Sequence, residues 1–352
     1  MAKLLGFANS RNVKPMSVVD HLAALGAWIE QRDEALDAAI DLAGQVNPWF
    51  VRPFCELALQ SLSRVLLDGD QIRDQGQFNL PKTRQKEART VGVVLPGKAP
   101  LAGIRDVLAV ALGGHKSLLK LAADDEYLWI PILRKWQELD PKTAPQRGDH
   151  LKDLDAIIFS FSGSNEDLLI KYFNQIPHFI GKQEKRVVLL NGTESSGVLR
   201  SVIGDVLNYY GLGPRAVTHV MVPEGFKLSK LLDATEDFRH ILKNTRYRSN
   251  LDFYLARAML NRTDHLHNDV LALVESEDVH SPTGILHYSR YATDTEAMAY
   301  LQKHAGEFDT LVTDDLSDWG VPTALAGTTH LWSLADVQAG RDISTFLANL
   351  QE

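Results

Sequence analysis

Short turns of small residues follow two of the apolar runs in this sequence, and each turn precedes a helical pattern. Gly97 and Lys98 end the first run, and Gly163 and Ser164 end the other. A small-residue turn that opens a helix directs backbone N–H groups and the positive end of the helix dipole toward an anion. Both turns are therefore candidate phosphate sites. Neither GxGxxG nor GxxxxGK[ST] is present, so an ordinary tight connection remains the alternative.

Other side chains with useful chemistry are scattered along the chain. Lys120 ends a further apolar run, where it could reach a ribose or phosphate or simply be a solvated lysine. His265 and His267 lie among acidic residues, but their spacing fits no standard metal motif, so we expect no metal. Ser195 is not in a GxSxG turn, which argues against a hydrolase nucleophile. The single cysteine, Cys55, lies on an apolar helical face, which favours a buried, unreactive thiol.

Composition restricts the classes of protein to which the chain could belong. It has 352 residues, 45% of them hydrophobic and 23% charged, which is typical of a globular protein with about two domains. The net charge of −8 argues against a nucleic-acid partner. We expect no membrane span and no secretory signal, because the apolar runs are too short. One cysteine fits a reducing compartment, so we expect a cytoplasmic protein.

The elements that would position these residues follow an alternating pattern. Residues 17–45 and 53–68 have helical spacing. From residue 91 onward, short β-branched runs alternate with helical patterns, which predicts an α/β fold with a mainly parallel sheet. Four strands are expected before residue 211, over 91–95, 117–121, 156–161 and 186–190; further strands are expected over 217–222, 270–274, 285–288 and 310–313. We place domain boundaries to give units 1–90, 91–210, 211–326 and 327–352, the last packing back on the fold.

Six segments occur in an order and at intervals that resemble one family. They are NPWF at 47–50, VGVVLPGKAPLAGIRDVLAVALGGHKSLLKL at 91–121, FSGSN at 161–165, FNQIPHFIG at 173–181, YYGLGPRAVTHVMVPEGF at 209–226 and SPTGILHY at 281–288. Together they resemble the bacterial acyl-CoA reductases related to the fatty acid reductase of bioluminescence, within the aldehyde dehydrogenase superfamily. The similarity covers nearly the whole chain from about residue 45.

The resemblance implies a fold, a reaction and a set of ligand-binding residues. It implies a Rossmann-type dinucleotide-binding domain over 91–210 and an α/β catalytic domain over 211–326. In the family reaction a cysteine thiolate attacks an acyl-CoA thioester, and NADPH or NADH then reduces the acyl-enzyme to an aldehyde. Gly97, Lys120, Gly163 and Ser164 would contact NADP or NAD. The partners implied are this nucleotide and acyl-CoA.

Two positions depart from the family pattern. The family's Gly-Leu-Gly-Cys-Arg is matched by Gly211–Arg215, so Pro214 occupies the position of the nucleophile. The family's Gly-Asn-x-Pro is matched by Gly97–Pro100, so Lys98 replaces an amide that would stabilise the oxyanion. We expect the charge of Lys98 to be balanced by Glu194 or by a ligand anion.

These departures leave two functions open. The first is a reductase of this family that is catalytically impaired. The second is a pseudoenzyme that binds a nucleotide or CoA as a regulatory or structural subunit, with a protein partner or as a homo-oligomer.

Overall fold

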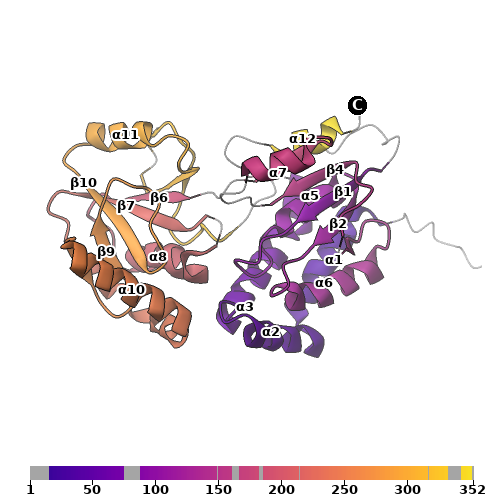
Figure 1. The fold of residues 1–352 in the computed structure, drawn as a ribbon, viewed down its shortest axis with the longest axis horizontal. Helices are drawn as coiled ribbons and strands as arrows, with labels where there is room; N and C mark the ends of the chain where they lie inside the picture. Colours follow the sequence, from indigo (N-terminus) through magenta and orange to yellow (C-terminus); the bar gives the residue numbers. More distant parts are fainter. Residues whose placement is uncertain are drawn as a thin grey trace, which may run out of the picture.

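Two β-sheets lie side by side in the molecule, and each is flanked by helices (Figure 1). The computed structural model describes residues 16–74, 88–148, 150–160, 166–181, 185–213, 215–315, 317–331 and 342–350. Nearly all strand pairs in both sheets are parallel. The predicted α/β class is therefore confirmed.

The described chain begins with a layer of helices. These are α1 (Val18–Gln31), α2 (Glu34–Val46), α3 (Arg52–Ser61), the π-helical turn η1 (Leu62–Leu66) and α4 (Gly69–Asp74). A reciprocal pair of hydrogen bonds between Ser17 and Asp20 caps α1, and Asp33 caps α2 by accepting from the Leu36 N–H at 2.8 Å. These caps explain why the helical pattern over 17–45 folds as two helices.

The first sheet holds five parallel strands in the order β3-β2-β1-β4-β5. They are β1 (Thr90–Val94), β2 (Lys116–Lys120), β3 (Gln146–Arg147), β4 (Ala156–Phe159) and β5 (His178–Ile180), connected by α5 (Ile104–Leu112), α6 (Glu126–Leu139) and α7 (Glu166–Phe173). The direction in which the sheet grows reverses between β1 and β4. Open parallel sheets bind ligands beyond the carboxyl ends of the strands at such a reversal. The turn that carries Gly97 and Lys98 follows β1 at this position.

Helices cover both faces of the first sheet. On one face the core is continuous with α5, α6 and the N-terminal helices and includes the fully buried Trp129 and Trp136. On the other face Phe159 packs against Phe173 of α7, with ring centroids 5.2 Å apart. The C-terminal helix α12 (Ile343–Asn349) packs on α5, and the Leu347 carbonyl lies 3.2 Å from Nε2 of His115.

The second sheet holds seven strands in the order β12-β11-β6-β7-β10-β9-β8. They are β6 (Arg186–Leu189), β7 (Val217–Pro223), β8 (His265–His267), β9 (Ala272–Glu275), β10 (Ile285–Tyr291), β11 (Thr310–Val312) and β12 (Thr323–Ala324). Among the strands that the structure describes, β8 alone pairs antiparallel, with β9.

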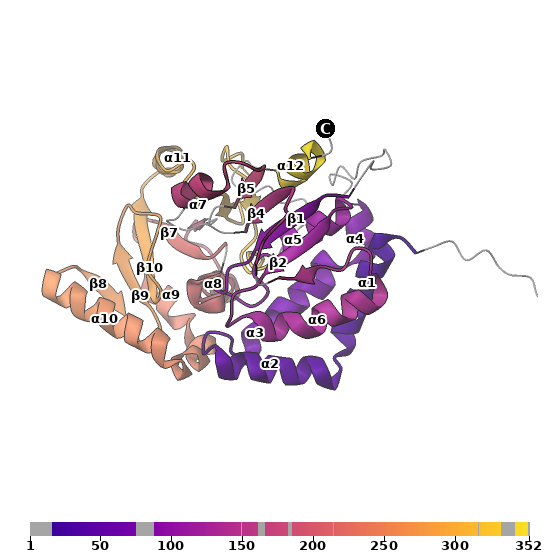
Figure 2. The same cartoon turned by 45° about the vertical axis from the view of Figure 1, so that its right-hand side comes forward.

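Helices also cover both faces of the second sheet (Figure 2). One face packs on α8 (Ser196–Leu207), α9 (Ser229–Asp233), the 3₁₀ segments η3 (Asn208–Gly211) and η4 (Glu236–Lys243), and α10 (Thr245–Asn261). The other packs on α11 (Asp294–Lys303). Among the described helices, none combines the length and apolar character needed to cross a membrane.

The sheets divide the chain at a different place from the expected boundary near 211–213. Strand β6 pairs with β7 and β11, so the change of sheet falls between β5 and β6, and 185–210 belong with the second sheet. Both faces of β6 are buried, by Val187 toward α11 and by Val188 toward α8. A strand buried on both faces has the same apolar sequence in either sheet, so its pattern does not show which sheet it joins.

Candidate functional site

The turn after β1 lies against the end of β2. The Leu95 N–H donates to the Lys120 carbonyl at 3.0 Å, so Lys120 ends its strand beside this turn. A Cβ on Gly97 would lie 2.6 Å from Cβ of Ala122 and 2.9 Å from Oδ1 of Asp124, so only glycine fits. The Lys98 side chain is exposed, although partial desolvation lowers its pKa.

Three of the predicted site residues lie outside the described part of the chain: Gly163, Ser164 and Pro214. The Ser160 N–H donates to the Val94 carbonyl at 3.1 Å, so Ser160 lies beside the end of β1.

The loop before β7 has an unusual backbone. Tyr209, Tyr210 and Gly211 have φ values of 53°, 59° and 70°, three left-handed residues in succession. For non-glycine residues this conformation costs about 1–3 kcal/mol each, and the surrounding structure must hold it. Tyr210 packs against Trp49 and Phe54, with ring centroids 5.0 and 4.9 Å away. The N-terminal helical layer therefore helps to fix the loop that leads to Pro214.

A cavity of about 410 Å³ lies where this loop, the turn after β1 and the start of the second sheet meet. Lys98 lines it from the first sheet, and Lys185 lines it from the residue before β6. Gly211 and Leu212, which closely precede Pro214, line it too. Its polar lining includes Thr218, Asn250, Ser281 and Thr283.

Lys185 is the most deeply buried charged side chain of this cavity. It is 7% exposed, and among the described residues it forms no ion pair. Burial, together with the nearby charge of Lys98, lowers the pKa of Lys185 to about 8. No aspartate or glutamate is among the described residues that line the cavity.

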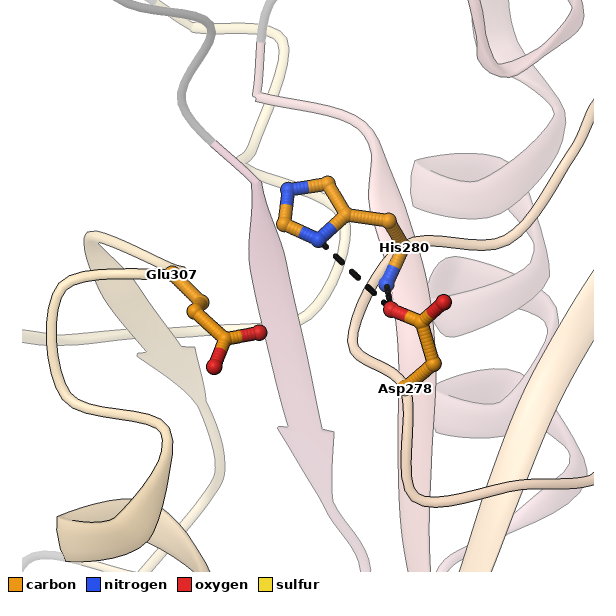
Figure 3. A group of neighbouring side chains, drawn as sticks. All are labelled: Asp278, His280 and Glu307. Atoms are coloured by element: carbon orange, nitrogen blue, oxygen red, sulfur yellow. Dashed lines mark hydrogen bonds and ion pairs between the residues drawn. The ribbon is translucent and has the colours of Figure 1, made fainter.

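His280 lies at the edge of the same cavity, beside two carboxylates (Figure 3). Its Nδ1 is 3.7 Å from Oδ1 of Asp278, and the potential ligand atoms of Asp278, His280 and Glu307 all lie within 4.8 Å of one another. Asp278 Oδ1 also accepts the His280 N–H at 2.8 Å, and Glu307 lies 3.0 Å from Nδ1 of His304. Hydrogen bonds within the protein thus already position these exposed carboxylates.

Glu194 does not balance Lys98, so this expectation is wrong. Its carboxylate accepts the N–H groups of Asn191 and Gly192 at 2.5 and 3.0 Å. It follows the carboxyl end of β6, whereas the cavity is at the amino end, so the length of the strand separates them. Glu194 instead lines another cavity, of about 550 Å³, with Arg200 and Lys230.

Cys55 is buried as predicted. It is 0% exposed, its Sγ lies 3.4 Å from the Phe50 carbonyl oxygen, and burial raises its pKa to about 12. It belongs to the helical core around the first sheet and does not line the cavity.

The sequence interpretation missed Lys185 as a site residue. The only signal was a lysine immediately before an apolar strand, which is usually a solvated end.

Comparison with known proteins identifies the fold. No protein-family model and no curated protein matches the chain. Among solved structures, an indole-3-acetaldehyde dehydrogenase complexed with NAD+ matches with a TM-score of 0.59 and 14% identity, over 90% of this chain and 74% of that one. A putative aldehyde dehydrogenase from Burkholderia cenocepacia matches with a TM-score of 0.60 and 13% identity, over 86% and 76%.

A third match is aldehyde dehydrogenase 21 from Physcomitrella patens, in complex with its reaction product succinate. Its TM-score is 0.61 at 12% identity, over 91% of this chain and 80% of that one. These likenesses confirm the aldehyde-dehydrogenase-like fold, with a Rossmann-type domain and an α/β catalytic-type domain.

Proposed function

We propose that this protein binds NADP or NAD and has lost the covalent step of the acyl-CoA reductases that it resembles. In this proposal it is a catalytically impaired member of that family, acting as a nucleotide- or CoA-binding regulatory or structural subunit. The aldehyde-dehydrogenase-like fold supports the proposal, and a protein of this fold is described with NAD+ bound.

The cysteine content carries the argument against covalent catalysis. The family reaction needs an accessible thiolate near the bound acyl group. This chain has one cysteine, and Cys55 is fully buried with a pKa raised to about 12. By the resemblance, Pro214 occupies the nucleophile's position, and a proline offers neither a thiol nor an N–H.

The second supporting observation concerns the oxyanion. By the resemblance, Lys98 replaces an asparagine amide, and Lys98 shares a cavity with Gly211 and Leu212 of the loop that leads to Pro214. A charged, flexible ammonium group differs from a fixed amide donor in geometry and in solvation. The two replacements therefore affect the same proposed reaction centre.

The residues around the first sheet fit a dinucleotide phosphate. The turn at Gly97 lies so close to the residues after β2 that a Cβ would clash, and it follows the strand at the switch point of the sheet. Lys120 ends the neighbouring strand. We propose that Gly97, Lys120, Gly163 and Ser164 hold the cofactor, which would supply a hydride donor or acceptor when bound.

Calorimetric titration with NADPH and NADH tests cofactor binding. Lys120→Met should lower the affinity for whichever nucleotide binds more tightly by about tenfold, because the substitution removes a charge-assisted contact to phosphate. Lys116→Met is the matched control, since this exposed lysine begins the same strand at its opposite end. Absence of heat with both nucleotides at millimolar concentration would contradict the proposal.

Nicotinamide absorbance tests the loss of activity. We expect no loss of NADPH absorbance that depends on acyl-CoA, over short, medium and long acyl chains. Turnover at rates ordinary for enzymes, about 1–1000 s⁻¹, would show an intact reductase that works without a cysteine nucleophile.

A further inference from the structure

Side chains that can bind a metal ion converge at the edge of the cavity between the sheets. They are Asp278, His280 and Glu307 (Figure 3). We propose that these three residues bind one Zn²⁺ ion, which accepts both imidazole and carboxylate ligands. The inference goes beyond the proposed function, because this site needs neither NADPH nor acyl-CoA.

The three ligands come from two loops. Asp278 and His280 lie between β9 and β10, and Glu307 follows α11. One potential ligand atom of each residue lies within 4.8 Å of those of the other two. Around a Zn²⁺ ion with bonds of about 2.0–2.2 Å, ligand atoms lie roughly 3–4 Å apart. All three side chains are exposed, so small rotations of their side chains can close the site around the ion.

Two imidazoles hold the backbone of the loop between β9 and β10. The Asp278 carbonyl oxygen lies 3.3 Å from Nδ1 of His219 on β7 and 2.8 Å from Nδ1 of His287 on β10. His219 is 0% exposed, so the loop is anchored in the core. The Asp278 carboxylate also accepts the His280 N–H at 2.8 Å. Two of the three ligands therefore start from a fixed backbone, which lowers the entropic cost of binding an ion.

A buried histidine outside the group is aimed at the third ligand. His304 is 8% exposed, and its Nδ1 lies 3.0 Å from Oε1 of Glu307. Its other ring nitrogen, Nε2, is buried without a hydrogen-bond partner in the described part of the chain. Such a nitrogen is least unfavourable as a lone pair, which leaves the ring proton on Nδ1 for donation to Glu307. Carboxylates that bind a metal are typically held by a hydrogen bond of this kind, so His304 supports Glu307 as a ligand.

The donor atoms favour zinc over magnesium or calcium. One imidazole nitrogen and two carboxylate oxygens are ligands that Zn²⁺ accepts, whereas Mg²⁺ and Ca²⁺ prefer larger sets of oxygen ligands. Three protein ligands leave the fourth tetrahedral position of Zn²⁺ to a water molecule. Because the three ligands are exposed, this position is open to solvent.

Isothermal titration calorimetry with zinc chloride tests the proposal on the full-length protein, after treatment with EDTA and dialysis. We expect one Zn²⁺ ion to bind per chain, with or without NADPH. Mg²⁺ should bind at least tenfold more weakly, because it gains little from an imidazole ligand. Equal affinities for the two ions would contradict a site that contains His280.

Substitutions of the ligands locate the ion. His280→Ala and Glu307→Gln should each weaken Zn²⁺ binding at least tenfold, because each removes one of the three ligands. Glu277→Gln is the matched control, since it also removes an exposed carboxylate, but one that pairs with Lys303. The affinity of this control for Zn²⁺ should equal that of the wild type.

Substitutions of His304 test its role as a positioning residue. His304→Ala should weaken Zn²⁺ binding by about 10–100-fold, the effect typical of losing a hydrogen bond to a metal ligand. His304→Asn should recover part of this affinity, because its amide N–H can donate to Glu307 in place of Nδ1–H. Wild-type affinity in folded His304→Ala would contradict Glu307 as a positioned ligand.

The histidines of β8 offer Zn²⁺ an alternative site, since the rings of His265 and His267 stack with centroids 5.4 Å apart. The double variant His265→Gln with His267→Gln should keep the affinity of the wild type. Loss of binding in this variant would overturn the proposal, and so would a wild type that binds no Zn²⁺ at 1 mM. Equal affinities in Glu277→Gln and in folded His280→Ala and Glu307→Gln would also overturn it, with folding checked by circular dichroism.

Discussion

Two adjacent cations at the start of β6, Lys185 and Arg186, lie in opposite electrostatic surroundings. Arg186 is buried at 5% exposure, and its charge attracts the carboxylates of Asp309 and Asp205. Lys185 is buried to a similar extent, yet the charge that acts on it is the like charge of Lys98. Arg186 therefore belongs to a buried polar network within the protein, and Lys185 belongs to a cavity.

The two side chains differ in which charge acts on them: opposite charges for Arg186, and a like charge for Lys185. The buried network supplies its own counter-charges and hydrogen bonds. Asp205 accepts the Gly327 N–H and the Thr329 hydroxyl, both at 2.6 Å, and so holds the segment after β12 against α8. Lys185, by contrast, has no aspartate or glutamate among the described residues that line its cavity.

The largest expected effect is that substitutions at Pro214 and Lys98 restore acyl transfer. Pro214→Cys alone should accept an acyl group from acyl-CoA slowly, because the amide donor to the oxyanion is still missing. Losing one such donor typically costs about 10²–10³ in rate, so Pro214→Cys with Lys98→Asn should be faster by up to that factor.

Mass spectrometry of the intact protein after incubation with acyl-CoA measures this acylation. Lys98→Asn alone, which has no new thiol, is the control. If Pro214→Cys is acylated as fast as the double variant, Lys98 does not contact the reacting carbonyl group and has no part in the loss of catalysis.

The next effect concerns the buried network and is a loss of stability. Asp205→Ala should lower the free energy of unfolding by about 3 kcal/mol, because it leaves buried donors without an acceptor. Asp252→Ala, on the exposed face of α10, should change it by less than about 0.5 kcal/mol. Urea denaturation compares the two variants. Similar free energies of unfolding in the two variants would mean that the Asp205 carboxylate does not hold the segment after β12.

A smaller effect should appear as a dependence of stability on pH. The pKa of Lys185 is lowered to about 8 in the folded protein, so above pH 8 the unfolded chain binds more protons. Its contribution should therefore raise the free energy of unfolding by about 2 kcal/mol between pH 7.5 and 9.5. Denaturation of wild type and Lys185→Met across this range isolates the contribution, because other groups titrate in both proteins.

We expect the free energy of unfolding of the wild type to rise with pH relative to that of Lys185→Met. If the difference in free energy of unfolding between the two proteins does not change with pH, Lys185 keeps an ordinary pKa and is better solvated than its burial indicates.

Three strands of the first sheet, β1, β2 and β4, could be predicted because each is a short run of mostly apolar residues. The short edge strands were not predicted: β3 has two residues, and β8 alternates exposed histidines without an apolar run. These strands form because a neighbouring strand offers hydrogen bonds, and that information is tertiary.

The site could be predicted only in part for the same reason. Lys98 was identified from its turn, which is local. Lys185 could not be, because its burial depends on β6 joining the second sheet and starting beside the turn after β1. Similarly, the left-handed Tyr209 and Tyr210 depend on packing against the distant Trp49 and Phe54.

The smallest expected effect concerns Cys55, which belongs neither to the cavity that contains Lys185 nor to the buried network that contains Arg186. With a pKa raised to about 12, its thiolate fraction at pH 8 is roughly a thousandfold below that of an ordinary thiol, and its sulfur is buried. A maleimide should therefore modify the folded protein only as fast as the helical layer opens, and quickly in urea. Cys55→Ala should bind NADPH like the wild type. Fast labelling of the folded protein, or loss of NADPH binding in Cys55→Ala, would show that this thiol is accessible or functional. The buried cysteine would then no longer distinguish this chain from the cysteine-dependent reductases that it resembles.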